Sequence, residues 1–173
     1  FFKKEFTELA GSSSGIIYEA GYESSETDFT SILEKIYELK PDVIFAPGGF
    51  TQSAMLIRQA KRMGIRSQFL GGDTWETHEF LSLGGEAVEG SMLTTSFSSE
   101  KPVSWTSRRF IYRYKKKYGR EPLSLSALGY DSYRIIIEAI KRAGTADDGK
   151  KLRDEIASTS DFRGATGTIS FDE

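Results

Sequence analysis

Cysteine is absent from this 173-residue sequence, and histidine occurs once, at His78. Without cysteine the chain has no thiol nucleophile, no thiolate metal ligand and no disulfide. A single imidazole gives little support to a histidine-rich zinc site or a Ser-His-Asp triad. We therefore expect no metal, no cofactor and no enzymatic activity, and we interpret His78 as a solvated helix residue.

An excess of one charge is also missing, because 23 basic residues balance 25 acidic ones to a formal charge of -2. Such a chain has no broad field to attract nucleic acid or anionic lipid. The lysines at 115–117 are typical of the solvated face of a helix. Apolar runs long enough to span a membrane, phosphate loops and dinucleotide fingerprints do not occur. The expected partners are small molecules or proteins.

Two short apolar runs, each ending in a pair of glycines, are the most informative feature that is present. Residues 42–46 lead to the pair at 48–49, and residues 67–70 lead to the pair at 71–72. Polar and aromatic residues follow each pair, and then a helical pattern begins. This arrangement predicts parallel strands whose carboxyl ends lie side by side, the edge at which open α/β sheets bind ligands.

Strand and helix patterns alternate in the first half of the chain and give way to helices in the second. The expected strands span residues 15–22, 42–46, 67–70 and 91–97, a last one begins at 167, and the later helices span 105–118, 125–143 and 150–158. Thr27 or Asp28 is expected to cap the helix that follows the first strand. The alternation predicts an α/β fold with a parallel sheet flanked by helices, and a boundary near 96–102.

The chain begins inside or just before a helix and ends in a strand that is expected to continue, so we interpret it as part of a longer protein. Six different short motifs lie along its length. They lie at 27–29 (Thr-Asp-Phe), 40–45 (Lys-Pro-Asp-Val-Ile-Phe), 69–73 (Phe-Leu-Gly-Gly-Asp), 87–90 (Ala-Val-Glu-Gly), 127–131 (Ala-Leu-Gly-Tyr-Asp) and 162–167 (Phe-Arg-Gly-Ala-Thr-Gly). In this order and spacing they resemble the type I periplasmic solute-binding proteins, in the branched-chain amino-acid branch that serves ABC transporters.

The resemblance implies a protein of two lobes that close on a ligand. Residues 1–97 would be the second, C-terminal lobe without its first strand, and residues 98–173 a connector and helical segment of the first lobe that ends near a hinge. The implied function is capture of an amino acid or similar solute outside the cytoplasm and delivery to an ABC-transporter permease, with membrane association only through the permease or an anchor. A sensor or receptor ectodomain of the same fold is the alternative, and an α/β enzyme with its catalytic groups elsewhere is a third.

The resemblance also places the ligand-binding residues. Asp73 matches the acidic residue that receives the ligand's ammonium, although a residue there also suits a helix cap. Gly49 and Phe50 stand where relatives commonly carry two tyrosines, which predicts a wider and more apolar pocket. Gly48 and Thr74 lie beside these positions in the two loops.

Two further aromatic residues have open assignments. Trp75 is either a wall of the pocket or locally packed, and Tyr130 either lies near the cleft or belongs to the core. The helical block would rest on a sheet that this chain does not contain, so its apolar stripe is expected to face water. That stripe comprises Phe110, Ile111, Leu128, Ile135, Ile136 and Ile140.

Overall fold

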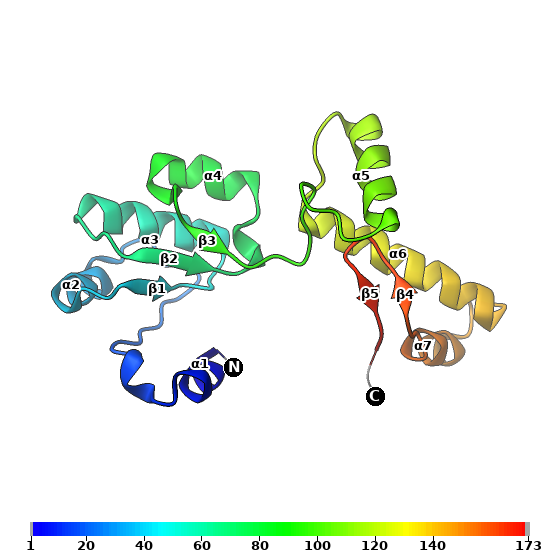
Figure 1. Cartoon of the computed structure of the whole chain (residues 1–173), viewed down its shortest axis with the longest axis horizontal. Coiled ribbons are helices and arrows are strands. Elements are labelled where there is room, and N and C mark those ends of the chain that lie inside the picture. Colours follow the sequence, from blue (N-terminus) through cyan, green and yellow to red (C-terminus); the bar gives the residue numbers. More distant parts are fainter. Residues whose placement is uncertain (1, 172–173) are drawn as a thin grey trace. The chain divides into compact units, whose positions relative to one another are not determined.

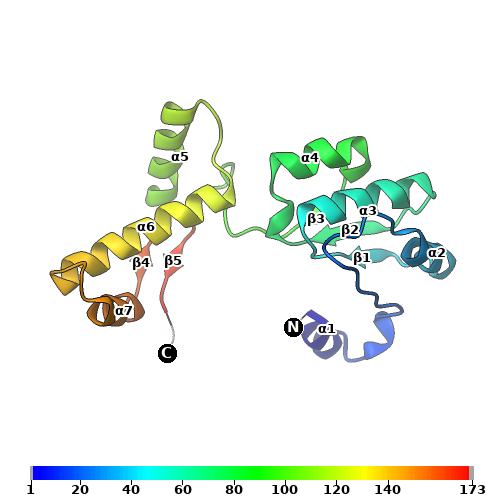
Figure 2. The ribbon, with the colours of Figure 1, turned by 180° about the vertical axis from the view of Figure 1, so that it is seen from behind.

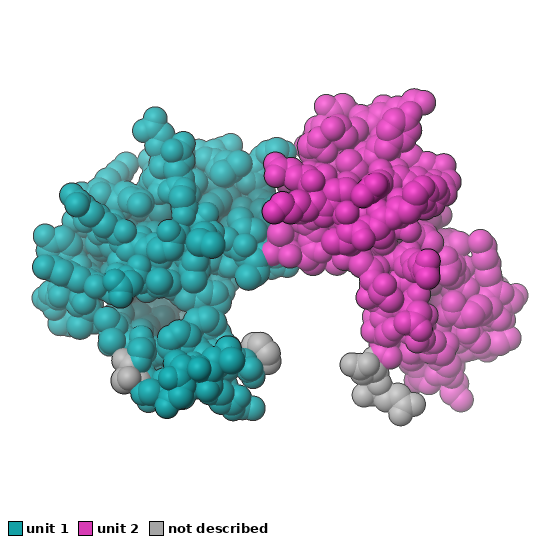
Figure 3. Space-filling model, in the orientation of Figure 1, with its two compact units in different colours: residues 1–94 teal, residues 95–173 magenta. Residues whose placement is uncertain are grey.

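The computed structural model describes residues 2–171, without the side chain of Ser14. It divides into two compact units, Phe1–Thr94 and Thr95–Glu173 (Figures 1 and 3). The division falls just before the boundary expected near 96–102. No helix among the described residues is both long and apolar enough to cross a lipid bilayer.

A parallel sheet forms the centre of unit 1, as the glycine-terminated runs predicted. Its strands are β1 (Val43–Phe45), β2 (Gln68–Gly71) and β3 (Met92–Leu93), in the order β1-β2-β3. Ile44 pairs with Phe69, and Leu70 pairs with Met92. The strand expected over 91–97 is therefore much shorter than its apolar pattern.

Helices flank this sheet, and all but the first of them contribute buried residues to the core of unit 1 (Figures 1 and 2). They are α1 (Phe2–Ala10), α2 (Thr30–Leu39), α3 (Phe50–Arg62) and α4 (His78–Gly84), joined by 3-10 turns η1 (Ser13–Gly15), η2 (Asp73–Trp75) and η3 (Gly85–Val88). The long α3 packs on α4, and its Ile57 and Ala60 join Phe29, Leu33 and Phe69 in one buried cluster. This burial fixes the ends of β1 and β2 beneath the candidate site.

The strand expected over 15–22 does not form. Its first residue closes the 3-10 turn Ser13–Gly15, and the remainder is extended without a ladder partner. Tyr22 instead turns toward Phe29, with its ring edge-on at 5.2 Å between centroids. Tyr22 is thereby half-buried, whereas Ile17 and Tyr18 of the same segment stay exposed.

Neither Thr27 nor Asp28, the two caps expected, occupies the N-cap position of α2, but Asp28 binds the first residue of the helix. Its Oδ1 accepts hydrogen bonds from the Thr30 amide at 3.0 Å and the Thr30 hydroxyl at 2.6 Å. These donors stabilise the carboxylate and hold the pKa of Asp28 below its ordinary value. The residue in the N-cap position itself is Phe29, which provides no side-chain cap.

The described part of unit 2, which ends at residue 171, contains three helices and a hairpin. The helices are α5 (Trp105–Tyr118), α6 (Ser124–Ala143) and α7 (Gly149–Ala157), and β4 (Phe162–Arg163) pairs antiparallel with β5 (Thr168–Ile169). Gly119 and Gly144 end α5 and α6 in the left-handed conformation, where a glycine carries no steric penalty.

Half of the apolar stripe expected to face water is buried, so that prediction is wrong for three of its six members. Phe110, Ile111 and Ile135 are buried. Leu128 and Ile140 are half-buried, and Ile136 is exposed. Phe110 and Ile111 share a core with Phe97, which follows unit 1 in sequence. The connector thus helps to cover residues that the sequence left open.

A buried carboxylate joins α6 to the hairpin. Asp131 is 1% exposed and accepts hydrogen bonds from the Ala165 amide at 2.7 Å, the Thr166 amide at 2.8 Å and the Thr166 hydroxyl at 2.9 Å. A Cβ at Gly164 would lie 2.7 Å from the Asp131 carboxyl carbon, so this backbone needs glycine to approach the carboxylate. We refer to Asp131 with residues 164–166 as the hairpin clasp.

Candidate functional site

The two loops that follow β1 and β2 lie side by side and are directly joined. Phe45 pairs with Leu70 in the sheet, so both chains leave it at the same edge. The Thr74 hydroxyl then donates to the carbonyl oxygen of Gly48 at 2.9 Å. This bond connects the first glycine pair to the residue beside Asp73, as the sequence predicted for the sheet edge.

Close approach explains one glycine of each pair. A Cβ at Gly48 would collide with the Tyr22 hydroxyl, and a Cβ at Gly71 would overlap the indole of Trp75. Gly49 and Gly72 have space for a side chain. None of the four has a positive φ, so contact rather than backbone conformation makes glycine necessary.

The two members of the second pair therefore give a matched test. We expect Gly71→Ala to lower the free energy of unfolding by about 1–3 kcal/mol, because the added methyl displaces Trp75 from a close-packed core. Gly72→Ala is the control and should remain near the wild-type value, since its backbone is extended and open. Urea unfolding of the full-length protein measures both, and equal effects would contradict this account.

Asp73 has the position and the freedom that a ligand contact requires. It is exposed, and its carboxylate makes no hydrogen bond or ion pair with any residue in 2–171. The cap of α4 is Thr77, whose hydroxyl accepts from the Phe80 amide at 3.0 Å. Asp73 therefore does not cap α4, and that alternative is wrong. Its role as ligand contact stays a prediction.

Trp75 belongs to the core, which decides between its two assignments. The side chain is 1% exposed and stacks on Phe80 with ring centroids 4.9 Å apart. Its Nε1 is buried without a hydrogen-bond partner among the described residues. The expectation that Trp75 forms a wall of the ligand pocket is thus wrong. The indole instead packs against Gly71 and supports the loop from beneath.

Phe50 and Gly49 lie at the start of α3. Phe50 is its first residue and is half-buried against the core of unit 1, while Gly49 is exposed in the N-cap position. Gln59, further along the same helix, holds the loop before α2 through Thr27 and Phe29 at 2.8 and 2.9 Å. Nearer the start of α3, the Gln52 side chain donates to the carbonyl oxygen of Ser24, so both parts of the helix are tied to the segment before α2.

Tyr22 is a neighbour of the site that the sequence did not single out. Its hydroxyl lies against Gly48, within the same loop as Gly49 and Phe50. The signal in the sequence was the glycine itself, which marks a close approach but does not name the group that approaches. The Tyr22 hydroxyl therefore lies near Gly49 and Phe50, the positions at which relatives commonly carry two tyrosines.

Tyr130 lies in unit 2, on α6, away in sequence from the six other candidates, which all lie in unit 1. It is half-buried, with its ring centroid 4.8 Å from that of Phe110 and the Arg134 guanidinium 5.6 Å from its ring. These contacts favour the core assignment, and a ligand role stays a prediction.

Among residues 2–171, no group of three or more histidine, aspartate or glutamate residues is arranged to hold a metal ion.

Comparison with known proteins agrees with this arrangement of sheet edge and loops. The family model described as "Periplasmic binding protein" matches residues 2–173. The chain belongs to the periplasmic binding protein family. The resemblance to its type I, branched-chain amino-acid members is confirmed, and this is a family of solute-binding proteins and receptors rather than enzymes.

Individual members of the family match nearly the whole chain. Leu/Ile/Val-binding protein homolog 1 of Brucella abortus is 28% identical over 171 residues, which are 99% of this chain and 44% of that protein. The crystal structure of a leucine-binding protein, LivK, from Thermotoga maritima superposes with a TM-score of 0.91 and 37% identity over 99% of this chain and 48% of the other. LivJ of Streptococcus pneumoniae, solved in complex with isoleucine, gives a TM-score of 0.76 and 32% identity over 87% and 43%. The chain thus spans somewhat less than half the length of these periplasmic binding proteins.

Proposed function

We propose that the complete protein binds an amino acid outside the cytoplasm and delivers it to the membrane component of an ABC transporter. One observation carries the proposal: an exposed carboxylate without a partner, Asp73, stands at the carboxyl edge of a parallel sheet in the loop joined to Gly48. The leucine-binding name of the Thermotoga maritima protein and the isoleucine in the Streptococcus pneumoniae complex support the same ligand class.

The chemistry follows from the two loops. The ligand's α-ammonium donates charge-assisted hydrogen bonds to Asp73, each worth about 1.5–3 kcal/mol. The aliphatic side chain lies over Phe50 and the space left by Gly49. Donors to the α-carboxylate come from the part of the protein outside this chain, and closure of two lobes removes the ligand from water.

Calorimetric titration of the full-length protein with leucine, isoleucine, valine, phenylalanine and glycine tests the proposal. We expect saturable binding with one ligand per protein for the hydrophobic amino acids. Binding of a sugar or a dicarboxylate, with no response to any amino acid, would contradict the assignment of Asp73 together with the proposed function.

The Gly49–Phe50 loop also predicts which amino acids bind best. Larger aliphatic or aromatic side chains should raise the melting temperature more than glycine or alanine, because they fill a pocket without tyrosine hydroxyls at these positions. Gly49→Tyr is compatible with the extended backbone of that residue and should reduce the shift for phenylalanine more than for valine. A thermal-shift series measures this, and an unchanged order of ligands in the variant would place Gly49 away from the ligand.

A further inference from the structure

The outward face of α5 carries a charge pattern that the small-molecule site does not use. Six of the 23 basic residues and none of the 25 acidic residues of the chain lie in this helix. An aromatic residue followed by two cations three and four positions later occurs twice, as Trp105 with Arg108 and Arg109, and as Tyr112 with Lys115 and Lys116. These spacings place all six side chains on one face, with the two sets about 10.5 Å apart along the axis.

This face is open to solvent on unit 2. Trp105 is 69% exposed and Tyr112 is 66% exposed, whereas Phe110 lies on the opposite side of the helix in the core and Ile111, 9% exposed, lies at the edge of the open face. Arg108 and Lys116 form no ion pair with a described residue. Lys115 pairs only with the exposed Glu121, and such a surface pair is worth no more than about 1 kcal/mol. The cations are thus available to a partner.

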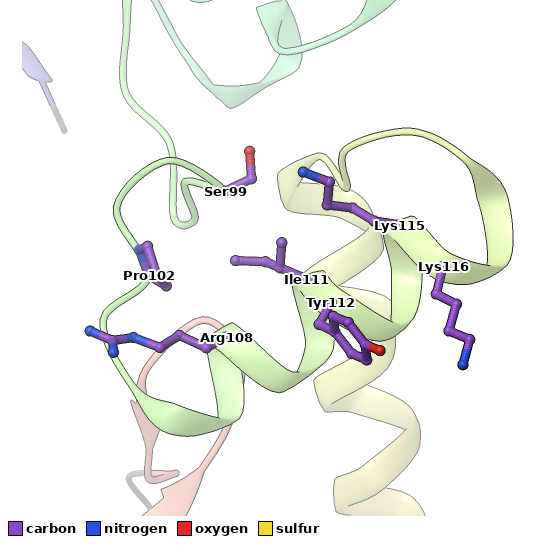
Figure 4. Close-up of a pocket in the computed structure, with 7 residues that line it drawn as sticks. All are labelled: Ser99, Pro102, Arg108, Ile111, Tyr112, Lys115 and Lys116. Carbon is purple, nitrogen blue, oxygen red and sulfur yellow. The ribbon is translucent and has the colours of Figure 1, made fainter.

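A hollow of about 570 Å³ lies along the same face and gives it a shape (Figure 4). Ile111 points from α5 toward Ser99 and Pro102 of the connector, and Arg108 and Lys115 lie on either side of it. Tyr112 and Lys116 complete the lining. The hollow therefore combines an apolar floor with a cationic rim, and it lies wholly within unit 2.

We propose that this face of α5 is a docking surface for an acidic helical segment of a partner protein. An apolar side chain of the partner lies on Ile111 and Pro102, and two sets of carboxylates one heptad apart pair with Arg108 and Arg109 and with Lys115 and Lys116. Exposed tryptophan, tyrosine and arginine are the residue types that contribute most at protein interfaces. A lipid surface fits less well, because Phe110 and Ile111 of α5 are buried and do not form an exposed apolar stripe that could enter the bilayer.

The test uses the full-length protein and a fluorescent helical peptide with two Glu-Glu pairs seven residues apart and leucine between them. Its counterpart with glutamine at all four positions is the uncharged probe. Anisotropy at low ionic strength should show the glutamate peptide binding at least about tenfold more tightly, with an affinity that falls as salt is added. Equal binding of the two peptides overturns the proposal.

Variants locate the binding on α5. Arg108→Gln with Lys116→Gln should remove the preference for the glutamate peptide, whereas Lys117→Gln, on the same helix beside Tyr118 and outside the hollow, should leave it unchanged. Arg108→Glu with Lys116→Glu should instead prefer a peptide with lysine in place of glutamate. No change in any variant, or tighter binding to vesicles of phosphatidylglycerol than to the peptide, overturns the proposal. Leucine titration of the same samples tests the small-molecule site separately.

Discussion

Replacement of Asp73 by alanine is expected to weaken amino-acid binding by about 2–5 kcal/mol, or about 30-fold to several thousand-fold in the dissociation constant. The ligand's ammonium would lose its counter-charge inside a closed site, and no other acidic residue of the two glycine loops replaces it. Calorimetry of the full-length protein with its preferred amino acid measures the loss.

A neighbouring carboxylate provides the control for this experiment. Glu79 is exposed in the first turn of α4 and lies outside the loop, so Glu79→Ala should bind as the unaltered protein does. The Asp73 variant should also keep its unfolding free energy, because the side chain makes no contact that stabilises the fold. A loss of less than about threefold on Asp73→Ala would remove this residue from the site.

The second large effect concerns stability and the hairpin clasp. Asp131→Ala is expected to lower the free energy of unfolding by about 2–5 kcal/mol, because the buried Ala165 amide and the half-buried Thr166 amide and hydroxyl lose the oxygen atoms that accept their hydrogen bonds. Urea unfolding of the full-length protein, monitored by circular dichroism, gives the value.

Two companions separate the clasp from a general effect of charge. Asp131→Asn keeps one acceptor oxygen and should lose less than the alanine variant. Asp147→Ala removes an exposed carboxylate from unit 2 and should leave stability within about 0.5 kcal/mol of the original. A change below about 1 kcal/mol for Asp131→Ala would show that the hairpin does not depend on the clasp.

Features with a local cause could be read from the sequence. The glycines at 119 and 144 end helices because a left-handed residue follows the last turn, and both helices end there. The parallel pairing of β1 and β2 followed from apolar runs separated by a helix of suitable length. The family resemblance predicts a ligand site at this edge for the same reason, since its motifs mark the strand ends, and the two loops do meet there.

Features that depend on a distant partner could not be read in this way. An extended apolar pattern at 15–22 does not say whether a neighbouring strand exists, and here Tyr22 packs on Phe29 and Gly48 instead. Whether Trp75 faces a ligand or the core depends on Gly71, which leaves the space that the indole fills. In the sequence, Asp131 is only one residue of the motif at 127–131. The folded structure shows that its carboxylate oxygens accept hydrogen bonds from amides more than thirty residues later.

The bond between the Thr74 hydroxyl and the Gly48 carbonyl joins the loop of Asp73 to the loop of Gly49 and Phe50. Its acceptor is a backbone atom, so the bond itself does not depend on the side chains of residues 49 and 50. Under the proposed function, Asp73 in the second loop recognises the ammonium common to all amino acids, and Gly49 and Phe50 in the first loop select among their side chains. Substitutions in the first loop can then change which amino acid is preferred while Asp73 in the second loop is kept. The same loop is the place to begin when ligand specificity is engineered.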